Sequence, residues 1–281
     1  MGIILAALAA VLYGSADFSG GLATRNNSAL QVIFVSQILG LGVILGSLPF
    51  FPGAVFLPMD LFWGGLAGIA GAVGLAFLYK GIASGIIAIV APITAVVGTV
   101  VPVFVGTLLG QMPSGLGWVG IVFGTSAIFL LAWEPPGHPD QHKVLGSLGY
   151  ALAAGVSFGI FSILIAESSP DSGVWPLVAS RLASVSALFL FLLYRRDSIH
   201  IRPGSRIPAG IAGVFDTLAN IAFLAATRII ILPIVAVVAG LAPGPTVGLG
   251  VIILKQRLGW VRVLGFLFAM IGIGLLSFSS S

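Results

Sequence analysis

The stretch Glu134–Lys143, EPPGHPDQHK, is the longest polar segment of the 281-residue sequence and lies almost at its middle. Its prolines disfavour a helix, and its charged side chains disfavour burial in lipid. Long apolar runs flank it on both sides. We therefore interpret it as part of a linker, and predict a first unit over residues 1–136, a linker over 137–145 and a second unit over 146–281.

The composition indicates that the apolar runs span a membrane. Hydrophobic residues make up 58% of the sequence and charged residues 7%, whereas a soluble domain carries about 25% charged residues. A bilayer core of roughly 30 Å needs about 20 apolar helical residues. Ten spans are predicted, over residues 3–23, 30–50, 61–83, 85–109, 115–133, 145–166, 174–194, 207–227, 229–254 and 260–278.

A shift of 145 residues superimposes the five spans of the two units without a gap. Matching pairs include Tyr13 with Phe158, Gln111 with Gln256, and Gly120 with Gly265. Because five is an odd number of crossings, the second unit enters the membrane from the opposite side. The predicted fold class is therefore an all-α integral membrane protein, with ten transmembrane helices in two inverted five-helix repeats around a central cavity. This construction recurs in transporters.

Basic residues outside the spans indicate the orientation. Arg228 lies on the side of the even-numbered loops, and the other basic residues near the spans lie on the opposite side: Arg25, Lys80, Lys143, Arg195, Arg196, Arg202, Arg206, Lys255, Arg257 and Arg262. The positive-inside rule then predicts cytoplasmic odd-numbered loops and both termini outside. The first run starts without a basic region, so we expect a retained span rather than a cleaved signal peptide. The predicted location is a bacterial cytoplasmic (inner) membrane.

Several local strings resemble the drug/metabolite transporter superfamily, in particular its ten-helix, EamA-like branch of amino-acid and metabolite exporters. The resemblance covers essentially the whole chain and rests on Tyr13-Gly14, Phe77–Gly81, Val90–Thr94, Leu108–Gln111, its second copy Leu254–Leu258, and Pro243–Thr246. Gln111 and Gln256 stand where that pattern usually has Glu. The resemblance implies a basket of helices around a central cavity, built mainly from the first, third, fourth, sixth, eighth and ninth spans.

Asp216 is the strongest candidate for a functional residue. It lies about ten residues into its span, roughly 15 Å deep at 1.5 Å per residue, near the middle of the bilayer. Asn220 follows one helical turn later on the same face. Because a lipid-facing carboxylate is costly, this polar stripe either lines the substrate path or takes up a proton, or it forms a structural salt bridge or a hydrogen-bonded helix contact.

Two further charged residues lie inside the predicted spans. Asp17 follows Tyr13 by one turn and is a candidate for proton coupling; the alternative is that it reaches water or pairs with a basic residue. Arg181 is the basic residue well inside a span. We expect it to pair with a buried acid, with a contact to a substrate carboxylate as the alternative, for which its planar guanidinium is suited.

The cavity wall is predicted to include aromatic and small polar side chains. Aromatic rings suit an organic, amphipathic solute, although each ring is as compatible with lipid contact or helix packing. The predicted cavity residues are Tyr13, Phe77, Tyr79, Thr94 and Phe158.

Prolines interrupt the fourth and ninth spans. Pro92, Pro243 and Pro245 each remove a backbone donor and should bend their helices. Bends in corresponding spans of two inverted halves are either hinges for a gate or static bends that improve packing.

The sequence contains no reactive constellation typical of an enzyme, and its lack of cysteine excludes disulfides and thiolate chemistry. We predict a secondary transporter that exports or exchanges amino acids or similar small metabolites by alternating access. A proton is the candidate coupling ion, and no cofactor, metal, nucleic acid or ATP is expected. The alternatives are a passive channel or facilitator for small solutes and, less favoured, a membrane assembly subunit.

Overall fold

The computed structural model describes residues 1–83, 87–133, 141–196 and 198–279, except for the side chains at 79, 83, 87–89 and 141–145. Within this part every regular element is a helix. The helices are α1 (Gly2–Thr24), α2 (Ala29–Ser47), η1 (Leu48–Phe50), α3 (Pro58–Ala83), α4 (Ile87–Leu108), α5 (Gly115–Ala132), α6 (Gln141–Ala166), η2 (Pro170–Ser172), α7 (Trp175–Arg195), α8 (Pro203–Thr227), α9 (Leu232–Ala239), α10 (Pro243–Leu254) and α11 (Trp260–Ser279).

The ten predicted membrane spans are confirmed as helices long and apolar enough to cross a bilayer, with α9 and α10 forming one interrupted span. The observed ends differ from the predicted ends by a few residues. α8 begins at Pro203, where a proline suits the first helical turn because its missing amide hydrogen would have no helical partner. α6 begins at Gln141, inside the predicted linker, and residues 137–140 of that linker lie outside the described residues.

Side-chain caps fix two of the helix starts. Ser28 Oγ accepts the amide hydrogen of Gln31 at 3.3 Å, and Gln31 Oε1 accepts that of Ser28 at 3.2 Å, which forms a capping box at the start of α2. Ser114 Oγ accepts the amide hydrogen of Gly117 at 3.1 Å and caps α5. These bonds satisfy amide groups that an apolar loop would leave without partners.

The ninth span is broken between α9 and α10. Pro243 and Pro245 have no amide hydrogen to donate to the carbonyl groups one turn earlier. Tighter bonds replace the helical ones: the amide of Ala242 donates to Ala239 O at 3.3 Å, and that of Gly244 donates to Leu241 O at 2.9 Å. α4, by contrast, continues through both Pro92 and Pro102. The structure thus interrupts the span with Pro243 and Pro245 and not the one with Pro92.

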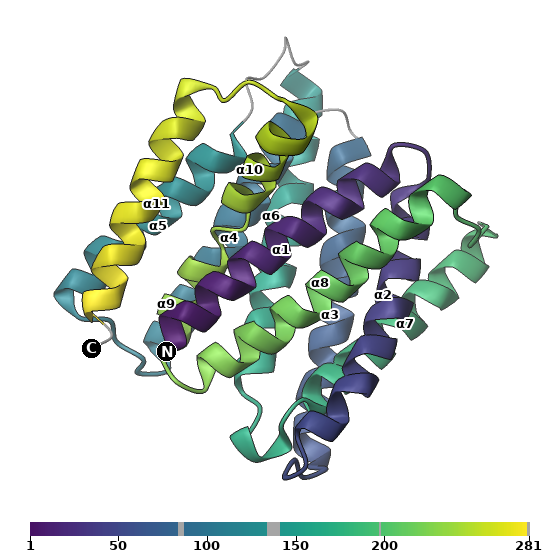
Figure 1. The fold of residues 1–281 in the computed structure, drawn as a ribbon, viewed down its shortest axis with the longest axis horizontal. Coiled ribbons are helices and arrows are strands. Elements are labelled where there is room, and N and C mark those ends of the chain that lie inside the picture. Colours follow the sequence, from purple (N-terminus) through teal and green to yellow (C-terminus); the bar gives the residue numbers. More distant parts are fainter. Residues whose placement is uncertain (84–86, 134–140, 197, 280–281) are drawn as a thin grey trace.

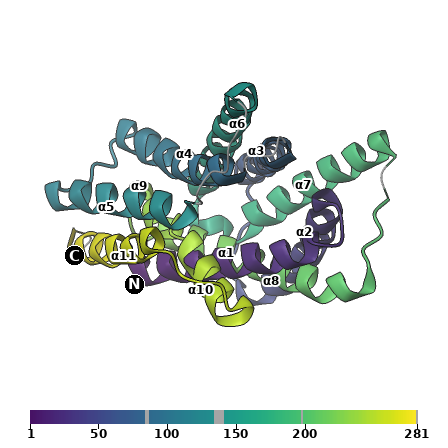
Figure 2. The same cartoon turned by 90° about the horizontal axis from the view of Figure 1, so that it is seen from above.

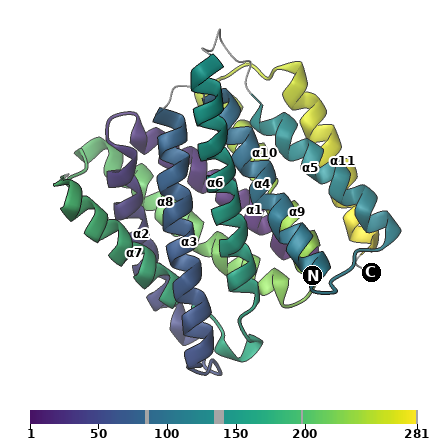
Figure 3. The ribbon, with the colours of Figure 1, turned by 180° about the vertical axis from the view of Figure 1, so that it is seen from behind.

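Helices of the two halves interleave in the bundle. α1 packs against α8, and α6 packs against α3; α2 lies against α8, and α7 lies against α3; α4 packs against α6, while α1 packs against α9 and α10. α5 pairs with α11 at one edge, and α2 with α7 at the other (Figure 1). α1, α8 and α10 lie in front in Figure 1, whereas α3, α4 and α6 cover the opposite face in Figure 3. Figure 2 shows both groups edge on, with α6 far from α1 and α11.

Glycines permit the closest approaches between helices of different halves. A Cβ atom on Gly68 of α3 would overlap the carbonyl oxygen of Ser180 in α7, and one on Gly213 of α8 would overlap that of Ser36 in α2. Gly68 and Gly213 are separated by the 145-residue offset of the sequence repeat. Backbone contact at these positions lets neither helix move away without losing dense packing.

The α5–α11 pair shows the same offset. A Cβ atom on Gly120 would lie 2.8 Å from Leu276 Cγ, and one on Gly265 would lie 2.9 Å from Leu131 Cγ. Both the glycines and the leucines are 145 residues apart. The inverted duplication stays a prediction, and it accounts for these paired contacts simply. The two termini lie at the same end of the bundle, which we call the terminal face (Figure 1).

The contact between α3 and α7 gives a stability prediction. Gly68→Ala should lower the free energy of unfolding by about 1–3 kcal/mol, because the new methyl group forces the backbone of Ser180 away from α3. The matched control is Gly65→Ala in the same helix, where a Cβ atom meets nothing within 4 Å. Thermal unfolding of the purified variants in detergent would compare them, and equal melting temperatures would contradict the proposed close packing.

Candidate functional site

A buried ion pair lies between α7 and α8. Arg181 of α7 donates from Nη2 to Asp216 Oδ2 of α8 and from Nη1 to Gln37 Oε1 of α2. The Arg181 side chain is 8% exposed and that of Asp216 is 35% exposed. The predicted pairing of Arg181 with an acid is confirmed, and this acid is only partly buried. Since an unpaired guanidinium is costly inside a membrane, three helices meet where this group is neutralised.

The same cluster extends through α8 to α1. Tyr13 donates its hydroxyl hydrogen to Asn220 Oδ1 at 3.0 Å, and Asn220 Nδ2 donates to the carbonyl oxygen of Asp216 at 2.7 Å. Asn220 is 7% exposed. Its amide is therefore occupied by two protein partners and links α1 to the ion-pair helix.

Gly40 on α2 makes room for the guanidinium. A Cβ atom on Gly40 would lie 3.4 Å from Arg181 Cζ and closer still to Thr217. Ser184 Oγ, one turn after Arg181, donates to Gln37 Oε1 at 3.1 Å. Two donors of α7, Arg181 and Ser184, therefore hold the side-chain oxygen of Gln37 in place.

Asp17 is the carboxylate of this region that has no fixed partner. It lies one helical turn after Tyr13 on α1, and no hydrogen bond of its side chain is found among the described residues. Asp17 is exposed. Asp17 is therefore an exposed carboxylate one helical turn from Tyr13, which belongs to the polar cluster. With all groups ionised, Asp17, Asp216 and Arg181 together carry one net negative charge.

Three other predicted cavity residues pack around α6 instead. Phe77 stacks on Tyr150, with ring centroids 6.4 Å apart, and Thr94 Oγ1 donates to Ala151 O at 3.2 Å. A Cβ atom on Gly74 would lie 2.8 Å from the ring of Phe158. These contacts join α3 and α4 to α6 and do not involve the charged cluster. The side chain of Tyr79 lies outside the described residues.

The proline break also touches α1 near the cluster. A Cβ atom on Gly14 would overlap Ala242 O, and Thr246 Oγ1 donates to Gly14 O at 3.0 Å. Tyr13 and Gly14 thus contact different elements. The tyrosine bonds to α8, and the backbone of the glycine packs against the break between α9 and α10. Movement at this break would be transmitted directly to the helix that carries Asp17.

Two cluster residues were not predicted from the sequence. Gln37 and Ser184 belong to the second and seventh spans, which were not expected to line the cavity. Gln37 is an amide deep in an apolar span, and such a group needs a polar partner in lipid. The amide of Gln37 and the charge of Arg181 both need polar partners from another span. Together they would have indicated contact between the second and seventh spans.

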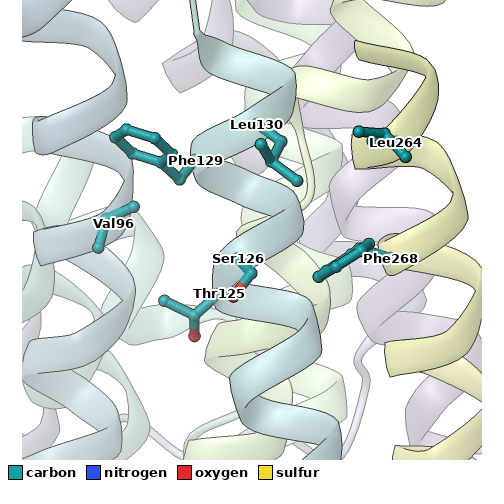
Figure 4. Close-up of a pocket in the computed structure, with 7 residues that line it drawn as sticks. All are labelled: Val96, Thr125, Ser126, Phe129, Leu130, Leu264 and Phe268. Carbon is teal, nitrogen blue, oxygen red and sulfur yellow. The ribbon is translucent and has the colours of Figure 1, made fainter. Parts of the chain in front are cut away.

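An apolar groove of about 560 Å³ lies elsewhere, between α4, α5 and α11 (Figure 4). Its lining residues are Val96, Thr125, Ser126, Phe129, Leu130, Leu264 and Phe268. None of these residues is charged, so the groove offers no partner for an ionised solute. We therefore place the candidate site at the charged cluster. Among the described residues no group of three His, Cys, Asp or Glu side chains is arranged to hold a metal ion.

Comparison with known proteins identifies the second half of the chain. Residues 145–278 form an EamA-like transporter family domain. A solved structure, described as a crystal structure of a protein, is similar over 99% of this chain and 96% of that chain, with a TM-score of 0.80 and 15% sequence identity. At this identity the likeness shows the fold alone. No curated protein matches the sequence.

The predicted resemblance to the EamA-like branch is confirmed by this domain. Together with the ten helices long and apolar enough to cross a bilayer, this domain shows a multi-pass membrane protein whose second half is an EamA-like transporter domain. Members of this family are transporters and not enzymes.

The ion pair predicts unequal costs for removing the two carboxylates. Asp216→Ala should lower the free energy of unfolding by about 2–4 kcal/mol, because it leaves Arg181 buried without a counter-ion while the partial exposure of Asp216 softens the loss. Asp17→Ala should change stability little, since Asp17 has no hydrogen-bond partner among the described residues. Denaturant unfolding of both variants would test this, and equal losses would show that Arg181 does not depend on Asp216.

Proposed function

We propose that this chain, with its EamA-like domain, is a secondary transporter that exports or exchanges amino acids or similar small metabolites by alternating access. The observation that carries the proposal is a polar cluster within the helix bundle, beside which the exposed carboxylate of Asp17 has no hydrogen-bond partner among the described residues. Ionisable residues within membrane spans typically mark substrate or ion pathways. The proposed location is a bacterial cytoplasmic membrane.

Both halves of the chain contribute to the cluster, which suits alternating access. Tyr13 and Gln37 come from the first half, and Arg181, Asp216 and Asn220 come from the second. A movement of one half against the other would therefore alter the contacts around Asp17. A site at the junction of two repeats is the usual arrangement in transporters of this construction.

The geometry favours a substrate with a cationic or hydrogen-bond-donating group. The guanidinium of Arg181 already binds Gln37 and Asp216, so it has little capacity left for a substrate carboxylate. Asp17 and the exposed part of Asp216, by contrast, can still accept further hydrogen bonds. We infer that they bind the ammonium group of an amino acid or related amine, and that a proton competes for the same carboxylate.

The break in the ninth span favours a transporter over a passive channel. Pro243 and Pro245 interrupt the helix beside Gly14, so a change of angle there displaces α1 together with Asp17. A channel would not need such a coupling between a helix break and the site. Exchange of substrate across the membrane is the property that distinguishes the two.

Counterflow in proteoliposomes tests this function. Liposomes loaded with an unlabelled amino acid should accumulate the same labelled amino acid in a saturable manner, and a screen of substrates at two pH gradients should identify the preferred one. Flux that neither saturates nor responds to competitors would indicate a channel, and no flux for any solute would favour an assembly subunit.

Asp17→Asn should reduce counterflow about tenfold or more and remove its response to the pH gradient. The reason is the loss of a charge-assisted hydrogen bond, which contributes about 1.5–3 kcal/mol. Ser15→Ala is the matched control, because Ser15 Oγ bonds only to Val11 O in its own helix, at 2.8 Å. Wild-type rate and pH response in Asp17→Asn would exclude the proposed role of Asp17.

A further inference from the structure

At the terminal face a glutamine of the first half caps a helix of the second half. Gln111, in the loop between α4 and α5, accepts the amide hydrogen of Leu232 on Oε1 at 2.7 Å. Leu232 is the first residue of α9, and the N-cap residue Ile231 supplies no side-chain cap. Gln111 thus satisfies an amide that the helix itself leaves free.

The loop geometry holds Gln111 in this position. Gly110 has φ of 87°, in the left-handed region, and the amide of Gln111 donates to Gly106 O at 2.9 Å. Gly106 also brings the two helices together, since a Cβ atom there would lie 2.9 Å from Pro233 Cδ. The end of α4 and the start of α9 are therefore in direct contact at the terminal face.

The second half contains the same loop at an offset of 145 residues. Lys255 is left-handed like Gly110, with φ of 54°. The amide of Gln256 donates to Gly250 O at 3.2 Å, one residue before the position that corresponds to Gly106. The residue that corresponds to Leu232 is Ile87, with which the described part of α4 begins. A glutamine after a left-handed residue, and a helix at the position that corresponds to α9, thus occur in both halves.

Gln256, the counterpart of Gln111, does not cap a helix among the described residues. Gln256 is exposed, and no hydrogen bond of its side chain is found in the part of the chain that the structure describes. α10 packs against α1 and α5, whereas α4 packs against α9. The fourth and ninth spans are therefore joined at the terminal face and not at the opposite face.

Other polar contacts lie at the terminal face, and one of them, between Asp60 and Ser169, joins the two halves. Arg228, at the end of α8, donates from Nη2 to Ser169 O at 3.2 Å and to Gly173 O at 2.6 Å. Asp60, at the start of α3, accepts the amide hydrogen of Ser169 at 3.1 Å. Burial lowers the pKa of the Arg228 guanidinium, and the carboxylates of Asp60 and Asp171 oppose this shift. All these contacts lie at the terminal face.

We propose that Gln111 and Gln256 are paired gate residues that cap opposite helices in the two states of the transporter. Gln111 caps α9 when the terminal face is closed, as in this structure, and Gln256 caps α4 when the opposite face is closed. Each bond breaks as the other forms, so the two glutamines stabilise opposite states. This inference rests on the proposed alternating access and names residues that control it.

The direction of the hydrogen bond determines which substitutions preserve the gate. Gln111 takes part as an acceptor through Oε1, so Gln111→Glu retains the bond to the amide of Leu232. Gln111→Met has a similar length and no comparable acceptor. A neutral hydrogen bond contributes about 0.5–1.5 kcal/mol, so Gln111→Met should raise the ratio of open to closed terminal faces about two- to tenfold.

Distances between spin labels in liposomes test the gate. The chain has no cysteine, so Met112→Cys and Ile229→Cys introduce the two labelled thiols. Met112 is 67% exposed and Ile229 is 52% exposed, on the two loops that the Gln111 bond connects. We expect a predominantly short distance in the doubly labelled parent. Gln111→Met should add a longer distance, and Gln111→Glu should not.

The repeat-related residue provides the decisive comparison. Adding Gln256→Met to Gln111→Met should reduce the longer distance towards the parent level, because it weakens the opposite state. The proposal is overturned if Gln111→Met leaves the distances unchanged, if Gln111→Glu behaves like Gln111→Met, or if Gln256→Met does not reverse the shift. These measurements need no substrate, so failed counterflow with an intact distance shift would contradict the proposed function and not the gate.

Discussion

Neutralisation of Arg181 is the constraint on which the interior of this protein depends. A guanidinium at this depth requires a counter-ion and further acceptors, and these come from different helices: Asp216 from α8 and Gln37 from α2. Gly40 is small because the guanidinium needs its space. Asn220 then bonds the backbone of Asp216 and the hydroxyl of Tyr13, which fixes α1 to the same group. Four helices are thus held in register by one buried charge, and Asp17 is left without a fixed partner.

This charged cluster has no repeat-related copy, although the helix packing is paired. At an offset of 145 residues, Asp216 corresponds to Gly71 and Arg181 corresponds to Ser36. A Cβ atom on Gly71 would lie 3.4 Å from the ring of Phe161, so an aromatic contact stands where the second half has an ion pair. The two halves therefore have similar helix contacts, but only the second half supplies the charged residues of the ion pair.

The helices could be predicted from the sequence because each run of apolar residues must satisfy its own backbone in lipid, which leaves a helix as the solution. The pairing of Arg181 also followed from its cost in a membrane. The cluster as a whole did not follow, since Gln37 and Ser184 are neutral residues whose role depends on which helices meet. Thr94 and Phe158 were assigned to the cavity from a motif and from ring chemistry, and neither property specifies a helix face. In the structure both pack between helices.

The contacts of Arg228 bear on how the sequence encodes orientation. Among the basic residues near the spans, Arg228 is the one on the side of the termini. It is partly buried, and its guanidinium is bound to the carbonyl groups of Ser169 and Gly173. Its position is thus explained by a structural contact with the α6–α7 loop. The positive-inside rule concerns basic residues in short loops near the ends of spans. Once Arg228 is assigned this structural role, the remaining basic residues used for orientation lie on the opposite face, and the predicted extracellular position of both termini no longer has an exception.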